Sequence, residues 1–597
     1  MKIITSFLFC LLLVSGTTQS YTLTFQVDMS GHTGFQAVGV RGNIAPLSWD
    51  KDYPLSDSNG DGIYEATIDF KTNKKYVQYK FQTDTQSELE GSDNRISWFS
   101  STTQASPQRF NEFDYYSPEK LATFTYTPAQ IEEDVAVLRK TLQYIHPNLY
   151  KYRDSLQLEK DFQTLQAQML AAPDLVNAYK AISQFATLIK CSHTFTNPWN
   201  QVTQIKKAIF YQPDKLPFSF QRIGKRLFID KNASLDTSLH KGLEILSINA
   251  ISTEEVLTRL TNYITSDGDN YEKRLQRLSL SGLEKFELFD IFYPLEFGSS
   301  SVFQLTLKDH TTGSIFETQV DALSKTARTA ILQERYDNLS TSFEEGWQFK
   351  ILNEQTAYLK MQSFAIYNNT FDWKGFLTNV FETLTDKKIQ HLIIDIRDNE
   401  GGNDDIVQYL LERILQQAIT METPAPYTVY RQIPEDLRPH ISTWEKRPYD
   451  WGNKIEASDK GRFVLKKQYA KRQVKYTPKS NGFKGKSYLL TNAENSSATH
   501  IMATYVKKYQ LATIVGQETG GNQKGLNGSF YFFHKLPNTR VEIDIPIFGI
   551  NILPDTPDTP NSGIVPDVLV EKNLSDLIYG IDTEMNVVLD LIKSYQK

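Results

Sequence analysis

The chain has 597 residues, of which 40% are hydrophobic and 22% charged, and its formal net charge is -6. This length suggests three or four domains, and the composition is that of a globular protein rather than a disordered one. Because there is no basic surplus and no long block of like charge, nothing favours nucleic acid as a partner.

The first twenty residues have the pattern of a secretory signal peptide. Lys2 precedes an apolar stretch from Ile3 to Val14, and small or polar residues follow. Such a stretch is too short to span a bilayer comfortably, and no later apolar run is long enough. Cys10 lies inside the stretch, without the small neighbours that lipid attachment needs. We therefore expect an exported protein (periplasmic, cell-surface or secreted) with no stable membrane insertion.

Residues 21–116 predict a small β-sandwich. Alternating strings such as TLTFQVDM and YVQYKFQT follow one another at short intervals, with turn signals between them. The arrangement resembles the starch-binding-type carbohydrate modules, which implies a possible polysaccharide partner. Trp49, Tyr53 and Trp98 are candidates for stacking on sugar rings, and the alternative is that they are ordinary core or edge aromatics of the sandwich.

Two further regions lie between the predicted β-sandwich and the C-terminal region. Residues 120–204 are predicted to be helical, because IEEDVAVLRKTLQYI and YKAISQFATLI place apolar residues three and four positions apart. Strands return in residues 205–349. There LPFSFQRIGKRLFI and KGLEILSINAIS resemble the strands of a PDZ-type module.

Residues 350–597 predict parallel strand–helix units. IQHLIIDI is a continuous apolar run, typical of a strand covered on both faces, and the loop RDNEGGN and a helix follow it. KSYLLTN, AENS and SATHIMATYVKKY repeat the plan. Parallel units place their strand-to-helix loops on one edge of the sheet, where ligands bind. The two loops are therefore expected to lie side by side.

Two serines stand where that second helix begins. Ser496 or Ser497 could simply cap the helix, a role worth about 1 kcal/mol. Alternatively, one is a nucleophile, with backbone N–H groups of the helix behind it to stabilise an oxyanion. Gly401 and Gly402 in the neighbouring loop would let a substrate carbonyl come close.

A nucleophilic serine also needs a base. His193 lies in CSHTFTNP after an apolar helix, in a polar segment, although a single His is more often structural. His500 follows Ser497 by one helical turn, and His391 opens a buried strand. No HExxH, CxxC or GxSxG motif supports a zinc protease or an α/β-hydrolase, so we expect no metal and no organic cofactor.

Four ordered motifs resemble a known family, the tricorn and C-terminal-processing serine peptidases. DIRDNEGG (395–402) is similar to its glycine loop, and TNAENSSATHIMA followed by TIVGQETGG to its nucleophile helix and the next loop. SGIVPDVLV (562–570) resembles its closing segment, and CSHTF the motif that carries the general base in the tricorn branch. The resemblance covers about residues 120–597. It implies a multidomain α+β fold with a PDZ-like module and a crotonase-like or ClpP-like α/β core behind the β-sandwich and the helical segment.

The resemblance also implies roles for individual residues. Ser497 corresponds to the nucleophile, Ala498 to one oxyanion donor, and Gly401 or Gly402 to the other. His193 corresponds to the base and Ser192 to its orienting neighbour. Candidates for the supporting acid are Asp555, Asp558 and Glu518. The lysine of the family's other branch is missing, since Asn522 takes its place and Lys524 comes two residues later.

The sequence therefore predicts a serine endopeptidase that cuts unfolded or exposed-tail polypeptides. Two alternatives remain. One is a catalytically inactive peptide- or glycan-binding protein on the same scaffold, and the other is a carbohydrate-linked role led by residues 21–116. The only cysteine left after signal cleavage, Cys191, lies beside the base but outside the helix-mouth site, so a thiol nucleophile is not expected.

Overall fold

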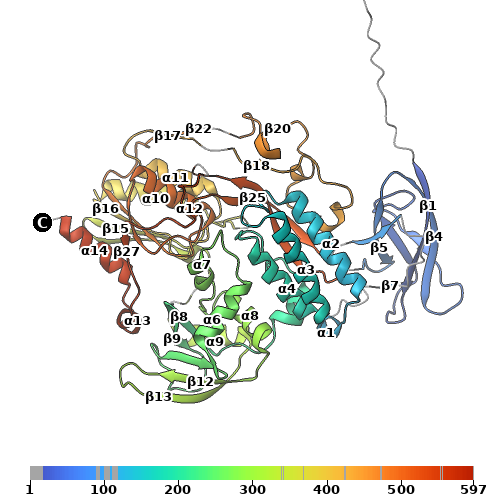
Figure 1. Cartoon of the computed structure of the whole chain (residues 1–597), viewed down its shortest axis with the longest axis horizontal. Coiled ribbons are helices and arrows are strands. Elements are labelled where there is room, and N and C mark those ends of the chain that lie inside the picture. Colours follow the sequence, from blue (N-terminus) through green and yellow to red (C-terminus); the bar gives the residue numbers. More distant parts are fainter. Residues whose placement is uncertain are drawn as a thin grey trace, which may run out of the picture. The chain divides into compact units, whose positions relative to one another are not determined.

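The computed structural model describes residues 18–88, 94–99, 108–110, 118–337, 339, 342–367, 369–422, 425–470, 473–551, 553 and 556–595. The chain forms two compact units, Met1–Phe124 with Pro434–Pro439, and Thr125–Ile433 with His440–Lys597 (Figure 1). Most of the predicted signal peptide, residues 1–17, lies outside the described residues, and the first strand begins at Gln19. No helix of the described residues is long and apolar enough to cross a membrane.

The first unit contains two β-sheets whose inner faces share one core. Their strand orders are β4-β1-β7 and β3-β2-β5-β6, and Phe25, Phe70 and Phe81 are among the buried residues between them. The elements are β1 (Gln19–Asp28), β2 (Val38–Gly42), β3 (Tyr53–Leu55), β4 (Ile63–Thr72), β5 (Tyr76–Thr83), β6 (Arg95–Trp98), β7 (Gln108–Arg109) and α1 (Pro118–Thr123). The predicted strands of the sandwich are therefore present.

The aromatic residues proposed for sugar stacking differ in their surroundings. Trp49 is 38% exposed, whereas Tyr53 packs against the core of the unit. Trp98 lies edge-on to Tyr76, with 5.2 Å between ring centroids. Of the three, Trp49 is exposed, whereas Tyr53 and Trp98 are partly buried.

The second unit begins with a helical layer, α2 (Pro128–Ile145), α3 (Ser155–Ala171), α4 (Leu175–Leu188) and the short α5 (Thr203–Ile205), which runs into a π-helical turn, Lys206–Phe210. Capping boxes at Thr127 and Asp154 satisfy the first N–H groups of α2 and α3. Lys190, just after α4, has a left-handed backbone with φ 56°. This turn redirects the chain, so that residues 191–193 leave the helix as a separate loop.

A six-stranded sheet follows the helices. It has the order β13-β12-β10-β9-β8, with β11 paired to β10, and its strands pair antiparallel. The elements are β8 (Phe218–Ile223), β9 (Arg226–Asn232), β10 (Glu244–Ile248), β11 (Ile251–Ser252), α6 (Thr253–Leu260), the 3-10 turn Thr261–Tyr263, α7 (Tyr271–Gln276), α8 (Leu288–Phe297), β12 (Val302–Lys308), β13 (Ile315–Asp321) and α9 (Lys325–Arg335). The strings predicted as strands form β8 to β11, and the PDZ assignment stays a prediction.

The last region is built on a second six-stranded sheet of order β14-β15-β16-β23-β24-β27, parallel except for the β14–β15 pair. Its strands are β14 (Trp347–Asn353), β15 (Thr356–Met361), β16 (His391–Asp395), β23 (Lys486–Thr491), β24 (Thr513–Gly516) and β27 (Val568–Leu569), preceded by the 3-10 turn Glu344–Gly346. The accompanying helices are α10 (Trp373–Asp386), α11 (Asp404–Ile414), α12 (Ser497–Tyr509), α13 (Leu574–Tyr579) and α14 (Thr583–Tyr595). The multidomain α+β fold is therefore confirmed.

Strand β16 shows why this sheet needs helices on both faces. Leu392 and Ile394 pack into the same core as residues of α10, α11 and α12. Ile393 packs into a second core with Val588 and Ile592 of α14. Since successive side chains of a strand point to opposite faces, the continuous apolar run predicted this arrangement.

A third sheet of the second unit was not expected. It has the order β19-β25-β26-β18-β21-β20, and a separate two-stranded antiparallel sheet pairs β17 with β22. The elements are β17 (Ile419–Glu422), β18 (Tyr427–Thr428), β19 (Ile441–Ser442), β20 (Ile455–Ala457), β21 (Phe463–Leu465), β22 (Gln473–Tyr476), β25 (Leu526–Lys535) and β26 (Glu542–Ile550), with 3-10 turns at Arg438–His440, Arg447–Tyr449 and Asp459–Gly461. The long β25–β26 pair carries aromatic side chains toward the predicted catalytic loops.

Candidate active site

The glycine loop between β16 and α11 is held by the side chains that precede it. Asp395 is 1% exposed and accepts hydrogen bonds from Tyr358 Oη (2.8 Å) and from Arg397 Nη2 (2.7 Å). Asn399 donates to the Met361 carbonyl (2.8 Å) and accepts from the Gly401 amide (2.9 Å). Asp395, the last residue of β16, and Asn399, in the loop itself, thus shape the loop.

Helix α12 is tied to the same loop, because β16 and β23 are neighbouring parallel strands. Thr499 Oγ1 donates to the Asn399 carbonyl (2.8 Å), and Asn495 Nδ2 donates to it as well (3.1 Å). A methyl group at Gly401 would lie 2.8 Å from Ala498 N and 3.0 Å from Ser497 Cβ. The predicted juxtaposition of the two loops is therefore present, and only a glycine fits it.

The two serines at the helix mouth have different surroundings. Ser496 is the N-cap residue, but its side chain makes no capping hydrogen bond, and its Oγ donates to the Glu400 carbonyl at 3.2 Å. The expectation that Ser496 acts as a side-chain cap is therefore wrong. Ser497 has φ 51°, a left-handed conformation that is unusual outside glycine, and it is partly exposed among buried neighbours. Strain at a polar residue of this kind is typical of functional sites.

The two glycines differ in the use of their amides. The Gly401 N–H donates to Asn399 Oδ1, and the Gly401 carbonyl accepts from Phe364 N at 3.1 Å. Gly402 has φ 139°, and the structure records no hydrogen bond from its N–H to a described residue. Ala498 is in the first turn of α12, where N–H groups lack helical acceptors. The amides of Gly402 and Ala498 are thus the ones open to an oxyanion.

His193 lies in the loop that follows α4, and it is oriented through Ser192. Ser192 Oγ is 3.1 Å from His193 Nδ1 and donates to Asp267 Oδ2 at 2.7 Å. The Ser192 amide donates to Asp267 Oδ1 at 3.0 Å. Asp267 is only 3% exposed, and it stands in the loop before α7. The chain therefore contains a carboxylate–hydroxyl–imidazole relay.

Electrostatics connect this relay to the glycine loop. Burial is the largest influence on His193 and lowers its pKa, whereas the charges of Asp267 and Glu400 oppose that shift. A neutral imidazole is the form that a general base requires. No hydrogen bond between His193 and Ser497 is recorded, a common situation in a site without substrate.

The acids proposed from sequence are not the ones that contact the histidine. Asp555 lies outside the described residues. Asp558 is exposed and has no recorded contact with His193. Glu518 accepts a hydrogen bond from the Gly563 amide at 2.7 Å. Asp267 was missed, because nothing in SDGD distinguishes it from an ordinary turn.

Of the other candidate bases, His500 is buried, whereas the contacts recorded for Lys524 are made by its backbone. Asn522 donates to Asn561 Oδ1 at 2.9 Å, and the Lys524 carbonyl accepts from Lys151 Nζ at 2.7 Å. His500 is 0% exposed, contacts Thr519 Oγ1 at 2.9 Å, and burial lowers its pKa to about 4.

Two further buried groups have shifted pKa values, Cys191 beside the relay and His391 at the end of β16 opposite the glycine loop. Burial raises the pKa of the Cys191 thiol to about 11, which makes it a poor nucleophile near neutral pH. His391 is 8% exposed, and burial together with Lys486 lowers its pKa.

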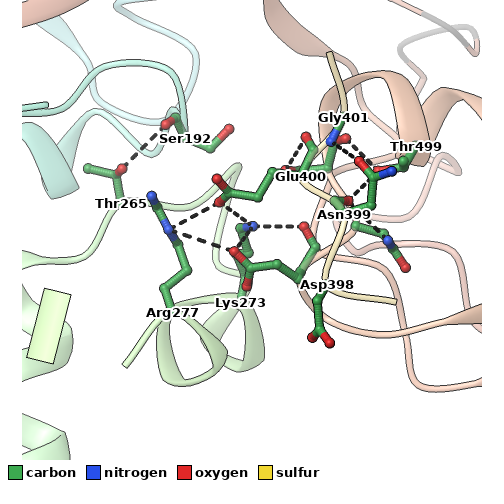
Figure 2. A network of polar contacts seen from close by, with 12 residues as sticks. Ser192, Thr265, Lys273, Arg277, Asp398, Asn399, Glu400, Gly401 and Thr499 are labelled. Carbon is green, nitrogen blue, oxygen red and sulfur yellow. Dashed lines mark hydrogen bonds and ion pairs between the residues drawn. The ribbon is translucent and has the colours of Figure 1, made fainter. Parts of the chain in front are cut away.

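A cluster of four charged residues flanks the glycine loop (Figure 2). Lys273 Nζ, from α7, lies 3.0 Å from a carboxylate oxygen of Glu400 and 3.0 Å from one of Glu494, and Arg277 Nε lies 3.3 Å from Glu400. Burial, together with the neighbouring Glu400 charge, raises the pKa of Glu494 to about 8. Arg277 and Lys273 hold the pKa of Glu400 well below its usual range, although burial opposes this.

Aromatic rings line the approach to His193. The Tyr531 ring of β25 lies 5.8 Å from the imidazole. Trp444, which is 61% exposed, lies 5.9 Å from Tyr531 and 6.2 Å from Phe530. These side chains form an apolar wall next to the relay.

Residues 355–570 match Peptidase family S41. Among solved structures, mature CPAF is similar with a TM-score of 0.52 and 13% identity, over 78% of this chain and 96% of that chain. The structure of mature CPAF complexed with lactacystin gives a TM-score of 0.51, 13% identity and coverage of 78% and 98%. Photosystem II D1 C-terminal processing protease gives a TM-score of 0.35 and 11% identity, over 74% and 93%. At these identities the CPAF likeness concerns the fold.

Proposed function

We propose that this chain, a serine-type peptidase of family S41, is an endopeptidase that works through an acyl-enzyme on Ser497, with His193 as the general base. The observation that carries this proposal is the packing of Gly401 against Ser497 and Ala498 at the mouth of α12. It puts a strained, partly exposed hydroxyl at the mouth of α12, next to the Ala498 amide, and Gly402, whose amide has no recorded acceptor among the described residues, follows Gly401 in the chain.

The reaction follows from these positions. His193 takes the proton of Ser497 while Oγ attacks the scissile carbonyl. The amides of Ala498 and Gly402 hold the oxyanion, and His193 then gives its proton to the leaving amine. Water hydrolyses the ester in a second cycle of the same proton transfers. Ser192 and Asp267 orient the ring and stabilise the imidazolium that forms in each cycle.

The substrates we infer are unfolded or exposed-tail polypeptides. An extended peptide can pair with an edge strand of the β8–β13 sheet and be presented to the core. The aromatic wall of Tyr531 and Trp444 beside the base supports accommodation of an apolar side chain near the scissile bond.

Mass spectrometry of peptides released from a denatured protein tests this function. The native chain should release peptides and react with a fluorophosphonate, whereas Ser497→Ala and His193→Ala should do neither while keeping their melting curves. Lys524→Ala is the matched control and should label normally. If His193→Ala were labelled and Lys524→Ala were not, the base would be the lysine. If the native chain itself were not labelled, the result would favour the inactive binding protein.

We also propose export, on the basis of the signal-like residues 1–20, and a glycan-binding role for the N-terminal unit, on the basis of the exposed Trp49 ring. N-terminal sequencing of the mature protein tests export. Polysaccharide pull-down with the full chain and Trp49→Ala tests glycan binding, and equal retention of both would remove Trp49 from the proposal.

A further inference from the structure

Three side chains around the proposed base form a compact set of metal-ligand types. One ligand atom each of Cys191, His193 and Asp267 lies within 4.8 Å of the other two. Cys191 and His193 come from the loop after α4, and Asp267 comes from the loop before α7. Cys191 is a free cysteine and is 1% exposed, and Asp267 is 3% exposed. The set is thus assembled by the fold from two separate segments.

The chemistry of this set suits one class of cation. Thiolate, imidazole and carboxylate together are ligands that Zn²⁺ accepts, and three protein ligands with one open position are a common zinc arrangement. Ligands at zinc-bonding distance stand roughly 3.3–3.8 Å apart, so the set has to contract by about 1 Å. Ca²⁺ and Mg²⁺ prefer oxygen ligands and do not suit a thiolate.

Ser192 occupies the position that a metal would take. Its Oγ stands between His193 Nδ1 (3.1 Å) and Asp267 Oδ2 (2.7 Å). A metal bound to these two groups therefore replaces the Ser192 hydrogen bonds. The relay and the occupied metal site are alternative states of the same two segments of chain.

We propose that Cys191, His193 and Asp267 form an inhibitory Zn²⁺ site that switches off the peptidase. The inference rests on the proposed role of His193 as the base. Zn²⁺ on Nδ1 leaves the single ring proton of neutral imidazole on Nε2. An Nε2–H group donates and has no lone pair to accept the Ser497 proton, so acylation stops.

The binding step is a ligand exchange without oxidation or reduction. Zn²⁺ releases water molecules, and bonds form to Cys191 Sγ, His193 Nδ1 and one carboxylate oxygen of Asp267. The Cys191 thiol releases its proton to solvent as the Zn–S bond forms. The open fourth position keeps a water molecule. Removal of the metal by a chelator reverses every step and restores the relay.

The experiment uses the full-length chain treated with EDTA and freed of chelator. Hydrolysis of a fluorogenic peptide is followed while ZnCl₂ is added, with CaCl₂ in a parallel titration. Zn²⁺ should inhibit, Ca²⁺ should not, and EDTA should restore the rate. Cys191→Ser should keep the basal kcat/KM and raise the inhibitory Zn²⁺ concentration at least about tenfold, since a ligand is lost. His310→Ala, which alters a histidine that pairs with Glu244 elsewhere in the unit, is the control and should be inhibited like the native chain.

A second readout does not depend on hydrolysis. Co²⁺ added in place of Zn²⁺ should give a thiolate-to-metal charge-transfer band in the native chain and in Ser497→Ala, but not in Cys191→Ser. Asp267→Asn, examined by this titration alone, should bind Co²⁺ at least about tenfold more weakly. Unchanged Zn²⁺ inhibition in Cys191→Ser, or the same band in Cys191→Ser as in the native chain, would overturn the site. A native chain that binds Co²⁺ with the band but cleaves no peptide would instead refute the proposed function.

Discussion

Replacing Asp267 by Asn removes the charge that supports the proposed base and keeps the shape of the side chain. The carboxylate and imidazole ligand atoms lie within 4.8 Å of each other. At an effective dielectric constant near 20, unit charges at that distance interact by about 3.5 kcal/mol. We therefore expect kcat to fall by about 10²–10³-fold, since each 1.36 kcal/mol is a factor of ten.

The pH dependence of kcat/KM in Asp267→Asn tests the direction of this electrostatic effect. The Asp267 charge raises the pKa of His193 against the lowering caused by burial. Its removal stabilises the neutral ring, so the acid limb of the kcat/KM profile should move to lower pH while the plateau falls. Stopped-flow acylation measured from pH 4 to pH 9 gives both the position of the acid limb and the height of the plateau.

Asp558→Asn is the matched control for that experiment, because Asp558 is an exposed carboxylate from the region where the sequence suggested the acid. It should leave the plateau and the acid limb unchanged. An Asp267→Asn variant with the native rate and profile, or a loss confined to Asp558→Asn, would refute the relay. A lower rate with an unmoved acid limb would reduce Asp267 to a structural residue.

Four other variants probe separate parts of the site. Ser496→Ala removes only the hydrogen bond to the Glu400 carbonyl, so the free energy of unfolding should fall by about 1 kcal/mol with little change in labelling; a loss of labelling would contradict this. Gly401→Ala places a methyl group 2.8 Å from Ala498 N, so kcat should fall about 10²-fold, as when an oxyanion donor is lost; a native kcat would show that Ala498 N plays no part. Glu494 has a raised pKa of about 8, so the folded state holds a proton that the unfolded carboxyl releases above its own pKa, and stability falls as pH rises toward 8. In melting curves measured from pH 5 to pH 9, Glu494→Gln should lose less stability with rising pH than the native chain does. An equal loss of stability in both would argue against this role of Glu494. Trp444→Ala should raise KM about fivefold for peptides with an aromatic residue near the scissile bond and little for alanine peptides, as expected for an aromatic contact of about 1 kcal/mol; equal changes for both would remove the ring from substrate selection.

The core of the candidate site could be predicted from the sequence because it depends on topology. IQHLIIDI and KSYLLTN are recognisable as buried parallel strands, and parallel strands bring the loops at their carboxyl ends together. The packing of Gly401 against Ser497 follows from that rule. The role of Ser496 could not be predicted from this rule. A capping residue is inferred from residue type, whereas the Ser496 hydroxyl is taken by the Glu400 carbonyl of another loop.

Asp267 and the third sheet depend on contacts that leave no local pattern. Asp267 and Ser192 are 75 positions apart, and the acid stands in a turn whose composition only indicates a turn. The strands β18 to β21 have two or three residues each, too few for a period of two to be recognised. Of these short strands, β19 pairs with the longer β25 and β18 with the longer β26, while β21 and β20 continue the sheet beyond β18, so their existence is a tertiary effect.

Residues 265–277 connect the two halves of the chemistry. At one end Asp267 binds Ser192 and so orients His193, and at the other end Lys273 and Arg277 contact Glu400, next to the glycine loop. The proposed base and the proposed oxyanion donors come from different regions of the chain, and no hydrogen bond joins the two directly among the described residues. A buried lysine is stable only with its partners in place, so the pairing of Lys273 with Glu400 and Glu494 fixes α7 against the loop. Because the same segment holds Asp267, fixing α7 also sets the distance between the imidazole of His193 and α12, which carries the proposed nucleophile.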